Sequence, residues 1–211
     1  MEVLRGQVDH IVYATPDLNS GMEQLGKLLG ITATPGGRHP GWGTHNALIS
    51  LGPDSYLEII GPDPESPKPE QPRPFQIDSL SAPRLVTWVA KGSGLTDLVN
   101  RAKQQGIMLG EVMAMSRHTP EGELLSWHLT NPMTIVADGI IPTFIDWGTT
   151  RHPALVAAQG ACLVNLRAEH PDAAKVTDSL NALGLGLPLV AGTQPGLIAT
   201  IDCPKGRVEL R

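Results

Sequence analysis

The stretch QVDHIVYATPDLNSGMEQLGKLLG, residues 7–30, decides the fold, because a strand pattern passes directly into a helix pattern. Residues 7–14 form a short, mostly apolar β-like run. Asp17 can cap the helix that follows, and Gly30 stands where that helix should end. The stretch therefore predicts a strand followed by one amphipathic helix. The apolar residues of the helix recur at helical spacing: Leu18, Met22, Leu25 and Leu29.

The same pattern of strand and helix returns twice more along the chain. β-like runs at residues 84–90 and 161–168 each precede a helix pattern, and these helices should end at Gly106 and Gly184. The three terminal glycines lie 76 and 78 residues apart (106 − 30 and 184 − 106). Spacing this regular indicates an internal repeat.

Each repeat ends in several short strand-like segments. Gly, Pro, Asn and Asp divide the apolar segments after each terminal glycine, which indicates a β-meander rather than another helix. One acid lies inside the last apolar segment of each repeat: Glu58, Asp146 and Glu209. The repeating unit is therefore predicted to be βαβββ, and the fold class to be α+β.

Proline content marks the boundary between the first two units. Residues 63–74 are too rich in proline for a helix or a central strand, so we expect a linker there. We expect paired modules at residues 7–62 and 83–148, within a first domain that covers residues 1–150. A third βαβββ-like module is expected at residues 160–211.

The composition argues against several classes of function. The 211 residues carry a formal net charge of −5 without a stripe of Lys and Arg, so nucleic acid is not an expected partner. No apolar run approaches the roughly 18 residues of a membrane span, and the N-terminal residues lack the apolar segment of a signal peptide. We therefore expect a cytoplasmic protein with no membrane partner. The two cysteines lack the spacing of a zinc site or of a disulfide framework.

Two strand sequences carry a resemblance to a known group of proteins. Residues 9–12, Asp-His-Ile-Val, and residues 56–60, Tyr-Leu-Glu-Ile-Ile, resemble a module of the vicinal oxygen chelate superfamily, which includes glyoxalases, extradiol dioxygenases and antibiotic-resistance proteins. Residues 35–48 and 144–148 resemble the glyoxalase-like domain proteins in particular. The resemblance spans most of residues 7–153. It implies that two βαβββ modules pair into a U-shaped mixed sheet whose cleft binds a divalent metal.

The same resemblance implies which residues hold the metal. In the superfamily, a first-strand residue and a last-strand carboxylate of each module are ligands, and in the first module these positions fall at His10 and Glu58. In the second module they fall at Trp88 and Asp146, and an indole cannot bind a metal. His45, on a strand-like run, is a candidate for the missing ligand. Two imidazoles and a carboxylate suit Fe, Mn, Ni or Zn, so the expected metal set is His10, His45 and Glu58.

Further residues are expected to bind or transform the substrate. Glu58 and Asp146 are the candidate catalytic residues, since each is an acid inside an apolar strand. A structural role stays open for each candidate, because histidines and tryptophans can be core residues and acids can face water on a half-exposed sheet. His39, His118 and His152 are expected to shape loops instead. The candidate substrate-binding residues are Asn46, Trp88, His128 and Trp147.

The resemblance, together with these residues, implies a glyoxalase-like enzyme that binds a divalent metal and acts on a small oxygen-bearing substrate. Lyase, isomerase and dioxygenase chemistry all stay open at this point. The alternative is a metal-free protein that sequesters an apolar or aromatic compound in the same cleft. The third module can also mediate the formation of a homodimer.

Overall fold

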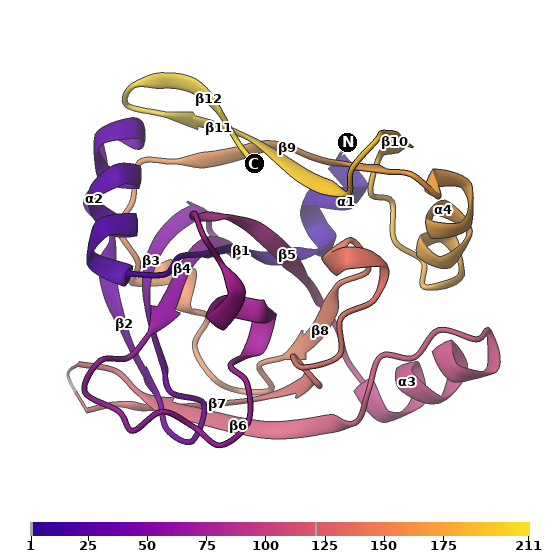
Figure 1. Cartoon of the computed structure of the whole chain (residues 1–211), viewed down its shortest axis with the longest axis horizontal. Coiled ribbons are helices and arrows are strands. Elements are labelled where there is room, and N and C mark those ends of the chain that lie inside the picture. The colour runs from indigo at the N-terminus through magenta and orange to yellow at the C-terminus, as the bar shows by residue number, and fades with distance from the viewer. Residues whose placement is uncertain (1, 121) are drawn as a thin grey trace.

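The computed structural model describes residues 2–120 and 122–211 of the chain (Figure 1). Each of three successive units has the order strand, helix and three strands. The helices are α1 Glu2–Gln7, α2 Leu18–Leu29, α3 Leu95–Gln104 and α4 Ala173–Ala182. The strands are β1 Val8–Ala14, β2 Thr34–His39, β3 Thr44–Gly52, β4 Ser55–Pro62, β5 Arg84–Lys91, β6 Val112–His118, β7 Leu124–Thr130, β8 Thr143–Asp146, β9 Cys162–His170, β10 Leu189–Ala191, β11 Gly196–Cys203 and β12 Gly206–Leu210. Short 3-10 helices are η1 Pro74–Ser79, η2 Ala137–Gly139 and η3 Pro153–Leu155.

The first two units form one eight-stranded sheet in the order β2-β3-β4-β1-β5-β8-β7-β6. In both units the first strand pairs in parallel with the last strand, β1 with β4 and β5 with β8. The antiparallel pair of β1 and β5 joins the two halves. Outward from this central pair, the fourth, third and second strands of each unit follow in the same order on both sides. Between β4 and η1 the chain forms no helix or strand, in keeping with its prolines.

Helix α2 shows how local sequence sets the ends of an element. The Asp17 side chain accepts a hydrogen bond from the backbone N–H of Ser20 at 2.7 Å, which caps the first turn. The helix ends at Gly30, whose φ of 75° lies in the left-handed region that glycine enters without strain. The helix predicted between these two residues is confirmed.

The third unit forms a separate four-stranded sheet in the order β10-β9-β11-β12. Here the first strand lies between β10 and β11, rather than beside the last strand. Figure 1 shows β9 and β11 along the top of the view, above β1 and β5 of the large sheet. The predicted α+β class, with two paired modules and a third C-terminal module, is confirmed, whereas the domain boundaries at residues 150 and 160 stay a prediction. In the described ranges, no helix is both long and apolar enough to cross a membrane.

The central strands of the eight-stranded sheet are buried on both faces, and β4 shows the division. Leu57 and Ile59 point outward into the main apolar core, which α2, α3 and the third unit complete. The alternate residues Tyr56, Glu58 and Ile60 point to the inner, concave face. Because its side chains alternate, β4 places the Glu58 carboxyl on the concave face, while Leu57 and Ile59 pack in the apolar core on the other face.

One long side chain closes the concave face. Arg117 on β6, at one edge of the sheet, donates a hydrogen bond from Nη1 to the backbone oxygen of Gly36 on β2, at the other edge. The sheet therefore curls until its two edge strands meet. The inner face becomes the lining of a concave, partly open space.

Candidate active site

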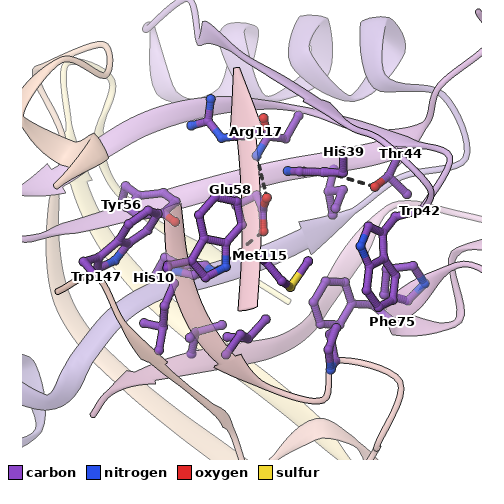
Figure 2. Close-up of a pocket in the computed structure, with 18 residues that line it drawn as sticks. His10, His39, Trp42, Thr44, Tyr56, Glu58, Phe75, Met115, Arg117 and Trp147 are labelled. Atoms are coloured by element: carbon purple, nitrogen blue, oxygen red, sulfur yellow. Dashed lines mark hydrogen bonds and ion pairs between the residues drawn. The ribbon is translucent and has the colours of Figure 1, made fainter. Parts of the chain in front are cut away.

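A narrow pocket lies on the concave face of the eight-stranded sheet, with a cavity volume of about 60 Å³. Strands from both halves of the sheet line it, and η1 covers one side. Figure 2 shows the Glu58 carboxyl at its centre, between the rings of His10 and His39. Polar groups therefore gather at one place in a lining that is otherwise apolar.

Glu58 is held in place on two sides. Its Oε1 accepts a hydrogen bond of 2.6 Å from Nδ2 of Asn46, on the neighbouring strand β3. Its Oε2 lies 3.7 Å from Nε2 of His10, on the other neighbouring strand β1. Glu58 is only 7% exposed and His10 only 5%, so the contact is shielded from bulk water. The second amide atom of Asn46, Oδ1, is buried and has no hydrogen-bond partner among the described residues.

The side chains of Asp9 and His10 meet although these residues are consecutive on β1. The pairing of β1 with β5 shifts by one residue between Val8 and His10, so Asp9 is the extra residue of a β-bulge. Asp9 Oδ1 consequently lies 2.7 Å from Nδ1 of His10. Since an ionised carboxylate can only accept, His10 carries a proton on Nδ1 and turns Nε2 toward Glu58.

Asp9 has further hydrogen-bond partners from the segment after β8. Its Oδ2 accepts from Nε1 of Trp147 at 3.0 Å and lies 3.2 Å from Nε2 of His152. Burial raises the pKa of Asp9, but the hydrogen bonds and charges of His10 and His152 outweigh it and lower the pKa to about 2. Asp9 is therefore ionised at neutral pH and fixes the orientation of the His10 ring.

His39 approaches the same carboxyl from β2. It is buried, and its Nδ1 lies 3.0 Å from the hydroxyl of Thr44. Burial is the main reason that its pKa is lowered to about 4. The negative charge of Glu58 raises the pKa, whereas the positive charge of Arg117 lowers it. At neutral pH His39 is an uncharged imidazole beside Glu58, able to donate or accept a hydrogen bond.

Aromatic rings form much of the pocket wall. The ring of Tyr56 stacks on His10, with ring centroids 4.5 Å apart. Burial raises the pKa of Tyr56 well above its usual value, and the charges of Asp9 and Glu58 add to this, so the phenol stays protonated. The remaining aromatic residues of the lining are Trp42, Phe75, Trp127 and Trp147. Such a wall suits a flat or apolar ligand.

Four of the expected site residues meet in this pocket. His10, Glu58, Asn46 and Trp147 all line it. Glu58 and His10 face each other, and Asn46 donates a hydrogen bond to Glu58. Trp147 donates a hydrogen bond to Asp9. These residues keep the candidate roles that the sequence suggested.

The structure places the other four expected residues elsewhere. His45 pairs with Gly61, whereas its neighbour Asn46 shares the inner face with Ile60 and Glu58, so His45 points to the outer face. Trp88 pairs with Ile11 and is fully buried in the main core, where its Nε1 donates to the oxygen of Ile140 at 2.8 Å. His128 and Asp146 pair with each other on the face of β7 and β8 opposite to the pocket.

The expected metal ligands therefore do not converge. Of His10, His45 and Glu58, only His10 and Glu58 meet. Within residues 2–120 and 122–211, no group of three or more His, Cys, Asp and Glu side chains is arranged to hold a metal ion. A catalytic zinc site takes three protein ligands, so the donors present fall short of the expected set.

Comparison with known proteins places this geometry in a family. The model of the family described as glyoxalase-like domain matches residues 8–184, most of the chain. The chain belongs to the glyoxalase-like domain family. The resemblance to the vicinal oxygen chelate superfamily that the sequence suggested is thereby confirmed.

Solved structures resemble this glyoxalase-like protein to different degrees. A hypothetical protein from Staphylococcus aureus is 15% identical, with a TM-score of 0.63 over 96% of this chain and 84% of that chain. Methylmalonyl-CoA epimerase from Mycobacterium tuberculosis is 17% identical, with a TM-score of 0.45 over 67% of this chain and 88% of that chain. The similarity to the Staphylococcus aureus protein concerns the fold alone. No curated protein sequence matches the chain.

The expectation that His39 shapes a loop is wrong, since it is on β2 and lines the pocket, and the sequence did not assign Asp9 or Arg117 to the site. His39 had a usable signal, because a short hairpin between β2 and β3 pairs it with Thr44 and so places it on the face of Asn46. Asp9 had none, since its contact with His10 depends on a bulge. Arg117 reaches the pocket only because the two edge strands meet.

Proposed function

We propose that this glyoxalase-like protein is an enzyme that moves a proton on a small substrate containing a carbonyl or hydroxyl oxygen. The observation that supports this most is the buried pair of Glu58 and His10, whose side chains face each other in one pocket, 3.7 Å between Oε2 and Nε2. Titratable groups that are desolvated together in a cleft are typical of acid–base sites.

Each member of the pair has a role that its contacts support. Glu58, as a carboxylate oriented by Asn46, accepts a proton from a carbon or oxygen of the substrate. His10, oriented by Asp9, presents Nε2 to the same space and is the second acid–base group. This arrangement of carboxylate and imidazole is the one by which enzymes fix the tautomer and direction of a catalytic histidine.

A divalent metal would add Lewis-acid stabilisation of the substrate oxygen, and Fe, Mn, Ni and Zn are the ions that the sequence suggested. The only two expected ligands that meet are His10 and Glu58, and both are accounted for by the acid–base pair. We therefore assign no step to a metal. Metal dependence is instead an outcome of the experiment below.

The experiment is proton exchange in D₂O, followed by proton NMR. The protein is incubated with 2-oxo acids, 2-hydroxy ketones and hemithioacetals of 2-oxoaldehydes, with and without a chelator. We expect C–H exchange in at least one class, insensitive to the chelator, and a loss of about 10²–10⁴-fold in E58Q. E111Q, which removes an exposed carboxylate, is the matched control.

Two results would contradict this proposal. Exchange at an unchanged rate in E58Q would remove Glu58 as the base. Exchange that disappears with the chelator and returns with one added ion would replace the acid–base pair by a metal mechanism.

A metal-free binding protein is the second candidate, supported by the aromatic lining. Trp127 and Trp147 lie with ring centroids 5.2 Å apart at one wall of the pocket. Sequestration of a flat apolar compound would quench their fluorescence to the same extent in native protein and in E58Q, without exchange of any proton. The two experiments together separate an enzyme from a binding protein.

A further inference from the structure

Arg117 is a buried cation that forms no ion pair with a described residue. Its side chain is on β6 and it is only 5% exposed, yet no carboxylate lies within ion-pair distance of it among the described residues. Arg73, another buried arginine, differs in this respect, because it forms an ion pair with Asp78. Arginines are rarely buried unless they are paired, so Arg117 is unusual within its own protein.

The guanidinium of Arg117 faces the pocket. It lines the same space as Glu58 and His10, and one of its nitrogens, Nη1, donates to the backbone oxygen of Gly36. A guanidinium carries five N–H donors, so further donors are available to a molecule in the pocket. The contact with Gly36 fixes the side chain at the place where the sheet edges meet.

The nearby anions of the protein are already engaged. Asp9 accepts hydrogen bonds from His10 and Trp147 and lies next to His152. Glu58 accepts from Asn46 and faces His10, and it attracts the charge of Arg117 without forming an ion pair with it. His39 is uncharged at neutral pH, since burial lowers its pKa to about 4. Arg117 thus has the longer-range attraction of Glu58 but no direct ion pair, so its guanidinium can pair with an anionic ligand.

The shape of the site indicates the kind of anion. The pocket is narrow and walled by aromatic rings, and a guanidinium matches a planar carboxylate by two parallel hydrogen bonds. We propose that Arg117 binds a carboxylate group of the substrate, so that the enzyme acts on small carboxylic acids with a flat or apolar body.

This inference rests on the proposed function and names its substrate class. With the carboxylate on Arg117, the neighbouring carbon lies on the side of Glu58. Its C–H bond breaks, the proton passes to a carboxylate oxygen of Glu58, and the electron pair moves to the oxygen of an adjacent carbonyl. Return of the proton to carbon completes the step without any oxidant or reductant.

The test compares two probes of nearly the same shape, phenylacetate and phenylacetamide, by isothermal titration calorimetry. The amide lacks the negative charge and has an NH2 donor in place of one acceptor oxygen. Hydrogen bonds to charged groups contribute about 1.5–3 kcal/mol, so we expect native protein to bind phenylacetate about tenfold to a hundredfold more tightly. R117M should bind both probes equally. R117K, which keeps the charge and loses the planar fork, should retain part of the preference and serves as the second variant should R117M fail to fold.

Two controls make the result specific. R101M removes an exposed charge on α3 and should keep the full preference for phenylacetate. E58Q should keep or increase it, because a negative charge near the ligand is lost. Equal binding of the two probes by native protein, binding of neither, or an unchanged preference in R117M or R117K would overturn the inference.

The outcome for Arg117 is separable from that for Glu58. If the charge preference is absent while E58Q still abolishes proton exchange, the substrate class is wrong and the acid–base site stands. If the preference is present while E58Q exchanges protons normally, Arg117 binds a carboxylate in a protein whose proposed chemistry is wrong.

Discussion

Asp9 and His10 are consecutive residues whose side chains contact each other, with 2.7 Å between Oδ1 of Asp9 and Nδ1 of His10. A regular strand would send them to opposite faces of the sheet. The bulge at Asp9 brings both to the concave side, where Asp9 orients the ring and His10 faces Glu58. One irregularity in one strand thus builds half of the candidate acid–base site.

Asp9→Asn should lower both stability and activity. The folded-state pKa of Asp9 is about 2 against an ordinary value of 3.8. A lowered carboxyl pKa gives stability that is present above about pH 4 and is lost as the pH falls toward 2, here about 2 kcal/mol. Denaturant unfolding of D9N at pH 7 should show a loss of this size, with a flatter pH dependence between pH 4 and 2.

The same variant should change the proton on His10. An amide can donate to Nδ1, which would move the ring proton to Nε2 and remove the lone pair that faces Glu58, so exchange activity should fall about a hundredfold or more. Nitrogen NMR of the ring reports this tautomer directly. D178N, which alters an exposed acid on α4, should change neither property, and a normal His10 tautomer in D9N would contradict the assigned role.

His39 should make the fold sensitive to mild acid. Burial lowers its pKa from 6.5 to about 4, so between these pH values the unfolded chain binds a proton that the folded protein does not. Stability should therefore decrease as the pH falls from 6.5 to 4, by about 3 kcal/mol from this residue. Urea unfolding at a series of pH values measures the slope.

His39→Gln should flatten that slope, because the amide does not titrate. H118Q removes an exposed histidine of β6 and serves as the control for losing an imidazole. A slope in H39Q as steep as in native protein would show that His39 is not the group responsible.

Trp88 and Trp147 should respond differently to replacement by phenylalanine. Trp88→Phe leaves a cavity in the main core and the oxygen of Ile140 without its donor, so about 2 kcal/mol of stability should be lost. Ligand affinity should not change, since Trp88 lies on the far side of the sheet from the pocket. Trp147→Phe should instead weaken ligand binding, because this ring lines the pocket and donates to Asp9. Unfolding and calorimetry experiments on both variants measure these effects. Weaker ligand binding by W88F, or unchanged binding by W147F, would refute the placement of the two rings.

Gly36 should tolerate no side chain. A Cβ at this position would collide with Oδ1 of Asn46, the residue that holds Glu58. Gly36→Ala should therefore cost about 1–3 kcal/mol through overpacking and reduce proton exchange by displacing Asn46. Gly26→Ala, where the nearest atom to the new methyl is 3.6 Å away, should fold at least as well as native protein because alanine favours the helix. Full activity in G36A would show that Asn46 does not position Glu58.

Local patterns in the sequence are sufficient to predict the repeat and to tell its helices from its strands. The residues that cap and end helix α2 can be recognised in the sequence, and the helix forms where the pattern predicts it. The alternation in β4 likewise predicts that Tyr56, Glu58 and Ile60 share one face of the strand. These features depend on neighbours a few residues apart, which is why a single sequence reveals them.

The candidate site could be predicted only in part, because alternation does not say which face of a strand is concave. The sequence proposed both His45 and Asn46, which are adjacent and must point to opposite faces. Strand pairing sends Asn46 inward to Glu58 and His45 outward. The same uncertainty applied to Trp88, whose position in the first strand of its unit resembles that of His10 but whose side chain points the other way.

The sequence by itself determined a repeated α+β chain with a carboxyl at the end of each unit, since capping, periodicity and alternation are local. The tertiary structure decided which polar groups meet. A bulge turned Asp9 toward His10, and curling of the sheet brought Arg117 on β6 to Gly36 on β2. Register and curvature arise from pairings between distant strands, and a shift of one residue transfers a side chain from one face to the other. The site therefore belongs to the folded sheet rather than to any one segment.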